Sequence, residues 1–364
     1  MKRMLCIISS LDAGGAETFL MKIYRALPPA DYQLDFVVSV GNGCYTEEVQ
    51  ARGGRIFEIP ERTKDVFGAF RGIYSIVREN RYDSVLKLGE NPLAAVDLLA
   101  AKLGGARHLA VRACNAPTGL PVKSRCLYAL VRPIQNRLAT VKLAPSQLAA
   151  DYLFGKNQNV KRIHNGVDLE YFRFIEKKRE SIRKEFDLAE KLVVGHVGRF
   201  VRQKNHDYLL EIFREIRKKQ ENAVLLLVGI GSLEGQIRDR VRELGLTDSV
   251  IFAGQRFDIP ALLSAMDVFV FPSFHEGMPN TVIEAQATGL PCLIADTITA
   301  EADITGLVQY AALEDSPECW AVRALSLVSA ERADTREAFR QQGYDIRQVA
   351  LELAELLCEG GNAQ

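Results

Sequence analysis

Short runs of apolar residues alternate along the chain with longer stretches in which apolar residues recur at helical spacing. In the first half, the apolar runs predict five buried strands, at residues 4–8, 34–40, 84–88, 109–112 and 142–144. The pattern restarts near residue 190, with predicted strands at 192–197, 224–228, 250–253, 268–271 and 292–294. Strands that alternate with helices are typical of βαβ units with parallel sheets. The sequence therefore predicts an α/β fold with two doubly wound, Rossmann-like domains.

The length of 364 residues fits two domains of ordinary size. We predict an N-terminal domain at residues 1–165 and a C-terminal domain at 166–342. A final helix at about 346–358 has apolar residues at helical spacing, and we expect the segment 343–364 to pack back on the N-terminal domain. Ligands of such folds bind where the carboxyl ends of the strands meet, so we expect the chemistry in a cleft there.

The composition, with 48% hydrophobic and 25% charged residues, excludes a disordered or fibrous chain. The net charge is zero, but residues 1–165 sum to +9 and residues 166–364 to −9. Residues 98–150 contain eight Lys and Arg and no acidic residue. Within them, 117–140 mixes apolar residues and cations as an interfacial helix does, which suggests docking on an anionic membrane surface. The alternative is a solvated face balanced by the acidic half of the chain.

The seven cysteines are odd in number, widely spread and never spaced as C-x-x-C. This pattern indicates neither a disulfide framework nor a zinc site, and it favours a reducing, cytoplasmic compartment. The five histidines also lack ligand spacing, so we expect no metal and no cofactor.

The most informative motif is FPSFHEGMPNTVIEAQATGLPC, at residues 271–292. A strand ends at Phe271 and a helix is predicted from Pro279. Free backbone N–H groups at the start of a helix bind anions, and a diphosphate would suit them. Two carboxylates beside that site would accept hydrogen bonds from sugar hydroxyls, although Glu276 could instead cap the helix. The motif therefore offers Glu276 and Glu284 as carboxylates and, as N–H donors, Gly277, Met278, Asn280 and Thr281.

A second motif, LVVGHVGRFVRQKN, begins at residue 192. Its strand runs into Gly198, where the missing side chain would let a ligand approach, and Arg199 and Lys204 follow. Two cations at a strand end match two phosphates. The alternative is an exposed loop with ordinary surface cations.

Two glycine motifs are less specific. Gly14 and Gly15 lie between the first strand and a helix, where their amides could approach a ligand or simply form a tight turn. The run after residue 228, with Gly229, Gly231 and Gly235, approximates G-x-G-x-x-G, but its third glycine is one residue late. The next strand also lacks the carboxylate that holds a dinucleotide ribose, so a dehydrogenase is disfavoured.

Together, the E-x7-E pair, Arg199 with Lys204, the Gly14-Gly15 pair and HNGVD at 164–168 resemble retaining glycosyltransferases of family 4. The resemblance spans the whole chain and implies the two-domain GT-B fold. The run HEGMPNTVIEAQATGLPC is similar to the branch that builds bacterial capsules and exopolysaccharides. The resemblance implies a nucleotide-sugar site in the C-terminal domain and an acceptor site in the N-terminal domain.

The roles that the resemblance implies fall on matching positions. Arg199 and Lys204 would bind the diphosphate, with Gly198 beside them, Glu284 would bind the ribose, and Glu276 would hold the donor sugar. The backbone around Arg256 and Phe257 would meet the base, and Pro279 would lie with the N–H donors. On this pattern Glu276, Arg199 and Lys204 carry catalysis.

The chain departs from the family near the end of its fourth strand. Relatives often carry a histidine there in a Ser-His-Asn context, and this chain has Arg112-Ala113-Cys114-Asn115. The histidine role does not transfer to Cys114, which we expect to be a buried structural cysteine. Arg112 or Asn115 would line the sugar site instead, with Gly14 and Gly15 also on the acceptor side. The Asp-x-Asp signature of metal-dependent glycosyltransferases is absent, which again predicts no metal.

These observations predict a retaining, metal-independent transferase of a hexose or N-acetylhexosamine. The donor would be a UDP-sugar, and the acceptor a hydroxyl of a polyprenyl-diphosphate-linked saccharide in cell-surface polysaccharide synthesis. The expected location is the cytoplasm, peripherally on the inner membrane face, and no nucleic-acid partner is expected. Two alternatives stay open: a nucleotide-sugar epimerase of the same fold, and a catalytically silent partner that binds a nucleotide-sugar.

Overall fold

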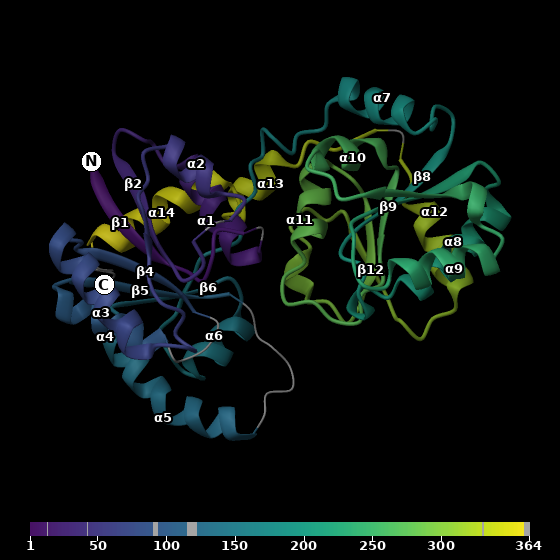
Figure 1. The fold of residues 1–364 in the computed structure, drawn as a ribbon. Coiled ribbons are helices and arrows are strands. Elements are labelled where there is room, and N and C mark those ends of the chain that lie inside the picture. The colour runs from purple at the N-terminus through teal and green to yellow at the C-terminus, as the bar shows by residue number, and fades with distance from the viewer. Residues whose placement is uncertain (13, 42, 90–93, 115–121, 330, 360–364) are drawn as a thin grey trace. The chain divides into compact units, whose positions relative to one another are not determined.

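The structure, a computed structural model, describes all residues except 13, 42, 90–93, 115–121, 330 and 360–364. The chain forms two compact units. The N-terminal unit contains Met1–Gly166 and Gly343–Gln364, and the C-terminal unit contains Val167–Gln342. The first boundary lies one residue after the predicted one, and the second coincides with it. Each unit has its own parallel sheet with helices on both faces, so the predicted fold class is confirmed (Figure 1).

The N-terminal unit is built on a seven-stranded sheet in the order β3-β2-β1-β4-β5-β6-β7. All neighbouring strands are parallel, and Met4 on β1 pairs with Leu34 on β2 and with Ser84 on β4. The strands are β1 (Lys2–Ile7), β2 (Tyr32–Val38), β3 (Ile56–Glu58), β4 (Ser84–Gly89), β5 (His108–Ala113), β6 (Val141–Ala144) and β7 (Lys161–Arg162).

Two layers of helices cover this sheet. Helices α1 and α14 pack on one face with a continuous apolar core, and α3, α4 and α6 pack on the other. The helices of the unit are α1 (Gly15–Ala26), α2 (Thr46–Ala51), α3 (Val66–Asn80), α4 (Ala94–Gly104), α5 (Val122–Leu138), α6 (Gln147–Phe154) and α14 (Ile346–Glu359).

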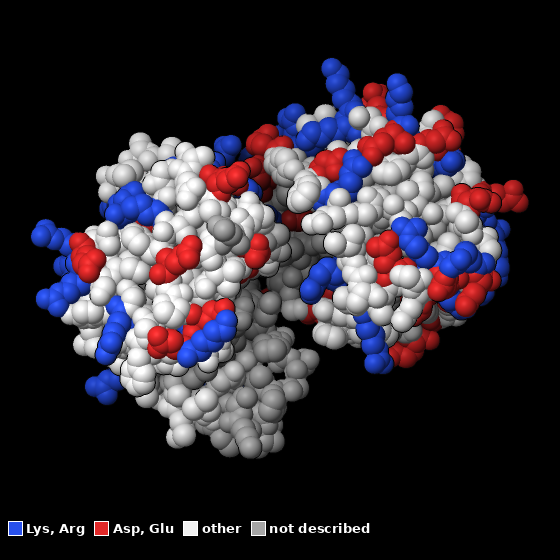
Figure 2. Space-filling view, viewed as in Figure 1, with Lys and Arg blue, Asp and Glu red and all other residues white. Residues whose placement is uncertain are grey.

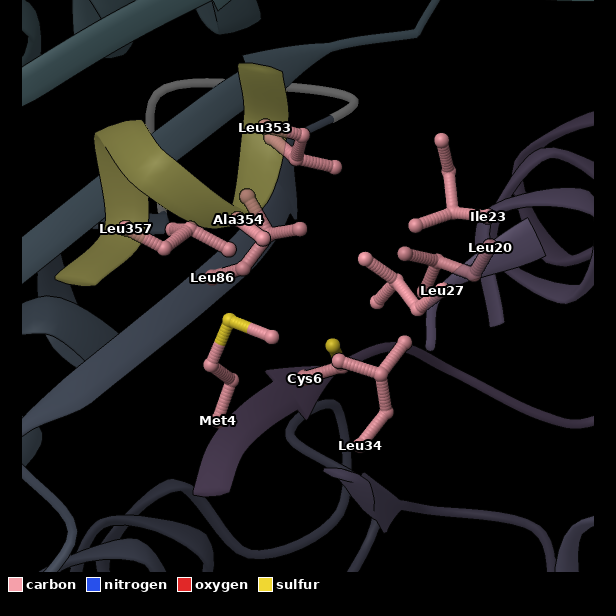
Figure 3. A pocket seen from close by; sticks show the side chains of 10 residues that line it. All are labelled: Met4, Cys6, Leu20, Ile23, Leu27, Leu34, Leu86, Leu353, Ala354 and Leu357. Atoms are coloured by element: carbon pink, nitrogen blue, oxygen red, sulfur yellow. The ribbon is translucent and has the colours of Figure 1, made fainter. Parts of the chain in front are cut away.

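The C-terminal helix α14 is part of the core of the N-terminal unit. Figure 3 shows its side chains Leu353 and Leu357 facing Met4 of β1 and Leu20 of α1. The gap that these side chains enclose leaves no space for a water molecule. The predicted core role of the final helix is therefore what the structure shows, and the apolar face of α14 is buried against α1, β1 and β4.

The C-terminal unit has a six-stranded parallel sheet in the order β10-β9-β8-β11-β12-β13. Its strands are β8 (Leu192–Val197), β9 (Ala223–Val228), β10 (Val250–Gly254), β11 (Val268–Phe271), β12 (Cys292–Ala295) and β13 (Val308–Ala311). Its α-helices are α7 (Glu176–Glu185), α8 (His206–Lys219), α9 (Glu234–Glu243), α10 (Ile259–Ala265), α11 (Asn280–Ala287), α12 (Pro317–Ser326) and α13 (Arg336–Gln341). Short 3₁₀ turns lie at Arg202–Lys204, Thr247–Ser249 and Ala300–Ala302.

Helix α7 carries the charge run EKKRESIRKE and is largely exposed, and Figure 2 shows Lys and Arg side chains along this rim of the unit. Two of its arginines nevertheless turn inward. Arg179 and Arg183 both donate to Ala265 O at the end of α10, and Arg179 also bonds the Asp267 carboxylate at 2.7 Å. They satisfy carbonyl groups that a helix leaves unpaired at its C-terminus.

Candidate functional site

The C-terminal unit has a topological switch point between β8 and β11. The chain leaves β8 toward β9 on one side and leaves β11 toward β12 on the other, so the loops after these two strands diverge. Parallel α/β sheets bind ligands at this position. The loop after β8 contains Gly198, Arg199 and Lys204, and the turn after β11 contains Glu276. The two most informative sequence motifs therefore meet at the switch point.

Among the described residues, three contacts join the two loops. The Phe274 N–H donates to Gln203 O at 2.9 Å, and Gln203 Nε2 donates to His275 O at 2.8 Å. Lys204 Nζ lies 2.7 Å from Glu276 Oε1, and the two side chains are only 14% and 10% exposed. Lys204 and Glu276, which are 72 residues apart in sequence, thus form one largely buried ion pair at the switch point.

The surroundings of Lys204 explain how its side chain is held. Its Nζ lies 4.5 Å from the centroid of the Phe271 ring, a favourable cation–π geometry. A Cβ added to Gly198 would lie 3.3 Å from Lys204 Cε and 3.1 Å from His196 Nε2, so the glycine leaves room for both side chains. Behind them, burial lowers the pKa of His196 well below its usual value and that of His206 to about 4. These histidines are therefore neutral at pH 7, and Lys204 supplies positive charge there.

Arg199 follows Gly198 and is exposed. Within the part of the chain that the structure describes, its guanidinium has no hydrogen-bond or ion-pair partner. Arg199 is therefore available to an anion, whereas Lys204 is already paired with Glu276.

Helix α11 begins at Asn280, one residue after the predicted start. Pro279 is its N-cap, and no side chain caps the helix. Val282 N and Ile283 N both donate to Pro279 O, whereas Asn280 and Thr281 lie in the first turn, where N–H groups have no intrahelical acceptor. Glu276 pairs with Lys204 instead of capping, so the capping alternative is wrong. Gly277 and Met278 precede the helix, and Glu284 lies half-buried in its second turn.

Arg256 and Phe257 follow β10, the strand that pairs with β9 at one edge of the sheet. The Arg256 guanidinium is held by the carboxylates of Asp258, at 2.6 Å, and Glu185, at 2.5 Å, and these bonds raise its pKa. The Phe257 side chain is 81% exposed, and its carbonyl accepts a hydrogen bond from Tyr171 Oη at 3.2 Å. The side chain of Arg256 is thus committed to its carboxylates, while the Phe257 ring is accessible.

The glycines after β9 have a structural function. A Cβ on Gly231 would lie 2.4 Å from Phe200 O, and Phe200 N donates to Ile230 O at 3.0 Å. Gly229 has a φ of +140°, and a Cβ there would lie 2.1 Å from Gly198 O. The loop after β9 therefore packs directly against the loop that carries Gly198 and Arg199.

The N-terminal unit has an equivalent switch point between β1 and β4, and a cavity of about 680 Å³ lies there. Gly14 is the N-cap of α1 and Gly15 its first residue, and the cavity reaches Ala16 and Glu17 in the same turn. Cys114 lines this cavity and is half-buried, so the expectation of a fully buried structural cysteine is wrong. Asn115 lies outside the described residues.

Arg112 is placed differently from the predicted sugar-site residue. It is buried, with its guanidinium 3.6 Å from the centroid of the Phe19 ring. Its Nη2 donates to Asn165 Oδ1 at 2.6 Å and to Ile163 O at 3.3 Å. Burial lowers the pKa of Arg112 to about 10. The side chain therefore fixes the HNGVD segment to α1, and it is not among the residues that line the cavity.

Sequence reasoning missed three charged residues of this cavity, Arg62, Lys87 and Asp97. Asp97 Oδ1 lies 2.7 Å from Arg62 Nε, and Asp97 Oδ2 lies 3.1 Å from Lys87 Nζ. Burial lowers the pKa of Lys87, and Asp97 opposes this shift. A signal was present, because Lys87 interrupts the apolar strand SVLKLG and Asp97 interrupts the apolar helix AAVDLLAAKLG.

Among the described residues, no group of three or more His, Cys, Asp or Glu side chains is arranged to hold a metal ion. Nor is any helix in the described ranges long and apolar enough to cross a membrane.

Two family models match the chain. The model described as Glycosyltransferase Family 4 matches residues 13–171, and the model described as Glycosyl transferases group 1 matches residues 178–345. One relative is EpsF of Bacillus subtilis (strain 168), to which a glycosyltransferase function is ascribed. It is 33% identical over 363 residues, which cover 95% of this chain and 94% of EpsF.

A second relative is the UDP-Gal:alpha-D-GlcNAc-diphosphoundecaprenol alpha-1,3-galactosyltransferase of Escherichia coli. It is 27% identical over 297 residues, 78% of this chain and 76% of the relative. Among solved structures, Anabaena Alr3699/HepE in complex with UDP has a TM-score of 0.79 at 20% identity, with 99% of this chain and 100% of that chain covered. A glycosyltransferase from Rickettsia africae ESF-5 has a TM-score of 0.82 at 16% identity, covering 100% of this chain and 99% of that one.

Proposed function

The chain belongs to glycosyltransferase family 4 and has the GT-B fold, and from this premise we propose that it transfers a hexose or N-acetylhexosamine from a UDP-sugar to a saccharide hydroxyl. The observation that carries the proposal is the Lys204–Glu276 pair at the β8/β11 switch point, a few residues before the start of α11. A cation, a helix N-terminus without a side-chain cap and a carboxylate at one place suit a diphosphate joined to a sugar.

In the proposed donor site, Lys204 and Arg199 bind the diphosphate together with the first-turn amides of α11. Glu276 accepts hydrogen bonds from hydroxyls of the donor sugar, and Glu284 from those of the ribose. The exposed ring of Phe257 and the adjacent backbone contact the uracil base. Gly198 keeps the approach to the diphosphate open.

Transfer breaks the bond between the anomeric carbon and the UDP oxygen, and a new bond forms from the acceptor hydroxyl oxygen to that carbon. The acceptor attacks on the face that UDP leaves, its proton passes to the departing phosphate oxygen, and the configuration is retained. The negative charge that develops on UDP is stabilised by Lys204, Arg199 and the α11 N-terminus. No protein nucleophile and no metal takes part in this proposal.

For the acceptor, we infer a saccharide linked to polyprenyl diphosphate, in bacterial cell-surface polysaccharide synthesis. The name of the Escherichia coli relative supports this choice, because its acceptor is a diphosphoundecaprenol-linked sugar. The outer layer of the N-terminal unit also supports it. Helix α5 exposes Leu127, Leu130 and Ile134 along one stripe, and Leu103 of α4 is exposed as well. Apolar side chains in a segment without acidic residues suit the surface of an anionic membrane.

The test is UDP release from a panel of UDP-sugars, with wild type, Lys204→Ala and Glu276→Ala. Lys204→Ala should weaken UDP binding itself, whereas Glu276→Ala should abolish transfer with only a modest loss of UDP affinity. Equal activity of both variants and wild type contradicts these roles. An epimerised UDP-sugar without free UDP would instead identify an epimerase, and UDP binding without turnover on any acceptor would identify a silent binding partner.

A further inference from the structure

A charged triad lies near the carboxyl end of β4, the central strand of the N-terminal sheet, outside the donor site. Lys87 near the end of β4 and Asp97 on α4 are both buried, and their ion pair measures 3.1 Å. Arg62 joins them through Nε at 2.7 Å from Asp97 Oδ1 and through Nη1, which donates to Ser39 Oγ at 3.1 Å. Charged groups are rarely buried in this way without a function or a compensating network.

The triad is not fully satisfied from within the protein. Arg62 Nη2 is buried and has no hydrogen-bond partner among the described residues. Lys87 Nζ has three protons, and among the described residues its one recorded ion pair is with Asp97. Buried donors without partners are costly, so this group is suited to a ligand that supplies acceptors.

The triad borders the cavity of about 680 Å³ at the β1/β4 switch point. Its volume falls within the roughly 300–1,000 Å³ typical of small-molecule sites. The cavity walls are mostly apolar, with Ile8, Val40, Leu88 and Val96 among them, while Ser9 and Ser39 add hydroxyl groups. The polar groups are therefore gathered against otherwise apolar walls.

The chemistry of the lining selects one class of ligand. An alkyl chain would bury the free donors of Arg62 and Lys87 against hydrocarbon. An anion would meet Glu17, Glu61 and Asp97, which outnumber the two cations. A pyranose ring fits both features, because its C–H faces contact apolar walls while neighbouring hydroxyls donate to Asp97 and accept from Lys87 and Arg62.

We propose that this cavity holds a pyranose ring of the acceptor, and that Lys87, Asp97 and Arg62 determine which hydroxyl pattern is accepted. As an assignment to the acceptor, this rests on the function proposed above. The three residues act on specificity and do not touch the diphosphate of the donor. Their replacement should therefore raise the acceptor KM and leave kcat and UDP binding almost unchanged.

Three variants test the inference. Asp97→Asn removes the charge of the side chain that would accept hydrogen bonds from the sugar hydroxyls, and it keeps the shape of that side chain. Val40→Trp fills the cavity from an exposed position of its wall, so that it does not disturb the core. Asp83→Asn is the matched control, because it breaks an exposed Arg–Asp pair in the same unit, the pair with Arg107, away from the cavity.

Binding is measured by saturation-transfer NMR with methyl glycosides of glucose, galactose and N-acetylglucosamine, and donor binding by the thermal shift with UDP. We expect wild type and Asp83→Asn to bind at least one glycoside. Asp97→Asn should lose about tenfold in affinity, the effect of one hydrogen bond to a charged group. Val40→Trp should lose at least as much, because its ring occupies the cavity. With a working acceptor, the same two variants should raise its KM by a similar factor at constant kcat.

The inference is overturned if wild type binds none of the glycosides, if it binds only octyl glycosides, or if Val40→Trp binds them as wild type does. The thermal shift separates this failure from that of the proposed function. Stabilisation by UDP without glycoside binding refutes the cavity assignment alone, whereas glycoside binding without any response to UDP refutes the proposed donor and leaves the pyranose site standing.

Discussion

The Lys204 ammonium lies 2.7 Å from the Glu276 carboxylate, and this ion pair connects the loop after β8 to the turn after β11. Removing one partner leaves the other charge largely buried and unpaired. We expect Lys204→Ala or Glu276→Ala alone to cost about 2–3 kcal/mol of stability, and the double variant to cost less than the sum. Urea unfolding of the four proteins checks this coupling, and strictly additive losses would show that the pair does not act as a unit.

Gly231 lets the loop after β9 pack against Phe200. In Gly231→Ala, the new Cβ would lie 2.4 Å from Phe200 O, so the loop that carries Arg199 must shift. We expect a loss of about 2 kcal/mol and weaker UDP binding. Gly235 is the matched control, since a Cβ there has no atom within 4 Å and lies in α9, where alanine should stabilise by up to about 1 kcal/mol. Similar thermal shifts for both variants would contradict this reading.

The sequence predicted the strongly apolar strands well, because burial on both faces leaves a continuous hydrophobic run. The bounds of β8 and β11 agree with the predictions residue for residue. Strands β3, β7 and β13 were missed. Both residues of β7 are exposed, and these short strands lie at or next to the sheet edges, where burial imposes little pattern.

The motifs of the proposed donor site could be found from sequence because each is a local segment at one strand end. Their pairing through Lys204 and Glu276 depends on the strand order β8-β11, which one sequence does not reveal. Arg112 is a residue whose place could not be predicted from its local sequence. A cation near a strand end was interpreted as a ligand residue, whereas its partners Asn165 and Phe19 come from distant segments and keep it buried.

Asp267 connects α7 to the start of β8 in the C-terminal unit. Its carboxylate accepts from Arg179 Nη2 and from the Val193 N–H, both at 2.7 Å. Asp267→Ala should therefore cost about 3 kcal/mol, because Arg179 and Arg183 lose their counter-charge. Glu234→Ala, which breaks the exposed pair with Arg238 on α9, should cost less than about 0.5 kcal/mol. Chemical unfolding compares the two, and equal losses would remove the case for a network at Asp267.

The buried histidine His206 predicts a loss of stability in acid. Burial, with a smaller effect of Lys204, lowers the pKa of His206 to about 4 in the folded chain. Its stabilising contribution is complete above the unfolded pKa of roughly 6.5 and is lost as the pH falls toward 4, because only the unfolded chain then binds the proton. This loss amounts to about 2 kcal/mol between pH 7 and pH 5. His206→Phe should lose correspondingly less stability over this interval, and an unchanged pH slope in urea unfolding would refute the assignment.

The exposed stripe of α5 predicts binding to anionic vesicles. Replacing Leu127, Leu130 and Ile134 by serine should reduce flotation with phosphatidylglycerol vesicles, because less apolar area enters the interface. Leu351→Ser on α14, in the opposite helical layer, is the control and should float as wild type does. Binding should also weaken at high salt. If wild type fails to float under any lipid or salt condition, the membrane surface is not a partner.

Because helix α14 follows the whole C-terminal unit in sequence, the N-terminal unit is completed last during translation. Leu353 and Leu357 cover one face of the N-terminal sheet, yet the ribosome makes them after residues 167–342, the whole of the second unit. The apolar face of the nascent N-terminal unit therefore stays uncovered while the C-terminal unit is synthesised. A premature stop before residue 346 would leave that face open permanently, and such truncated products would be natural clients of chaperones and proteases.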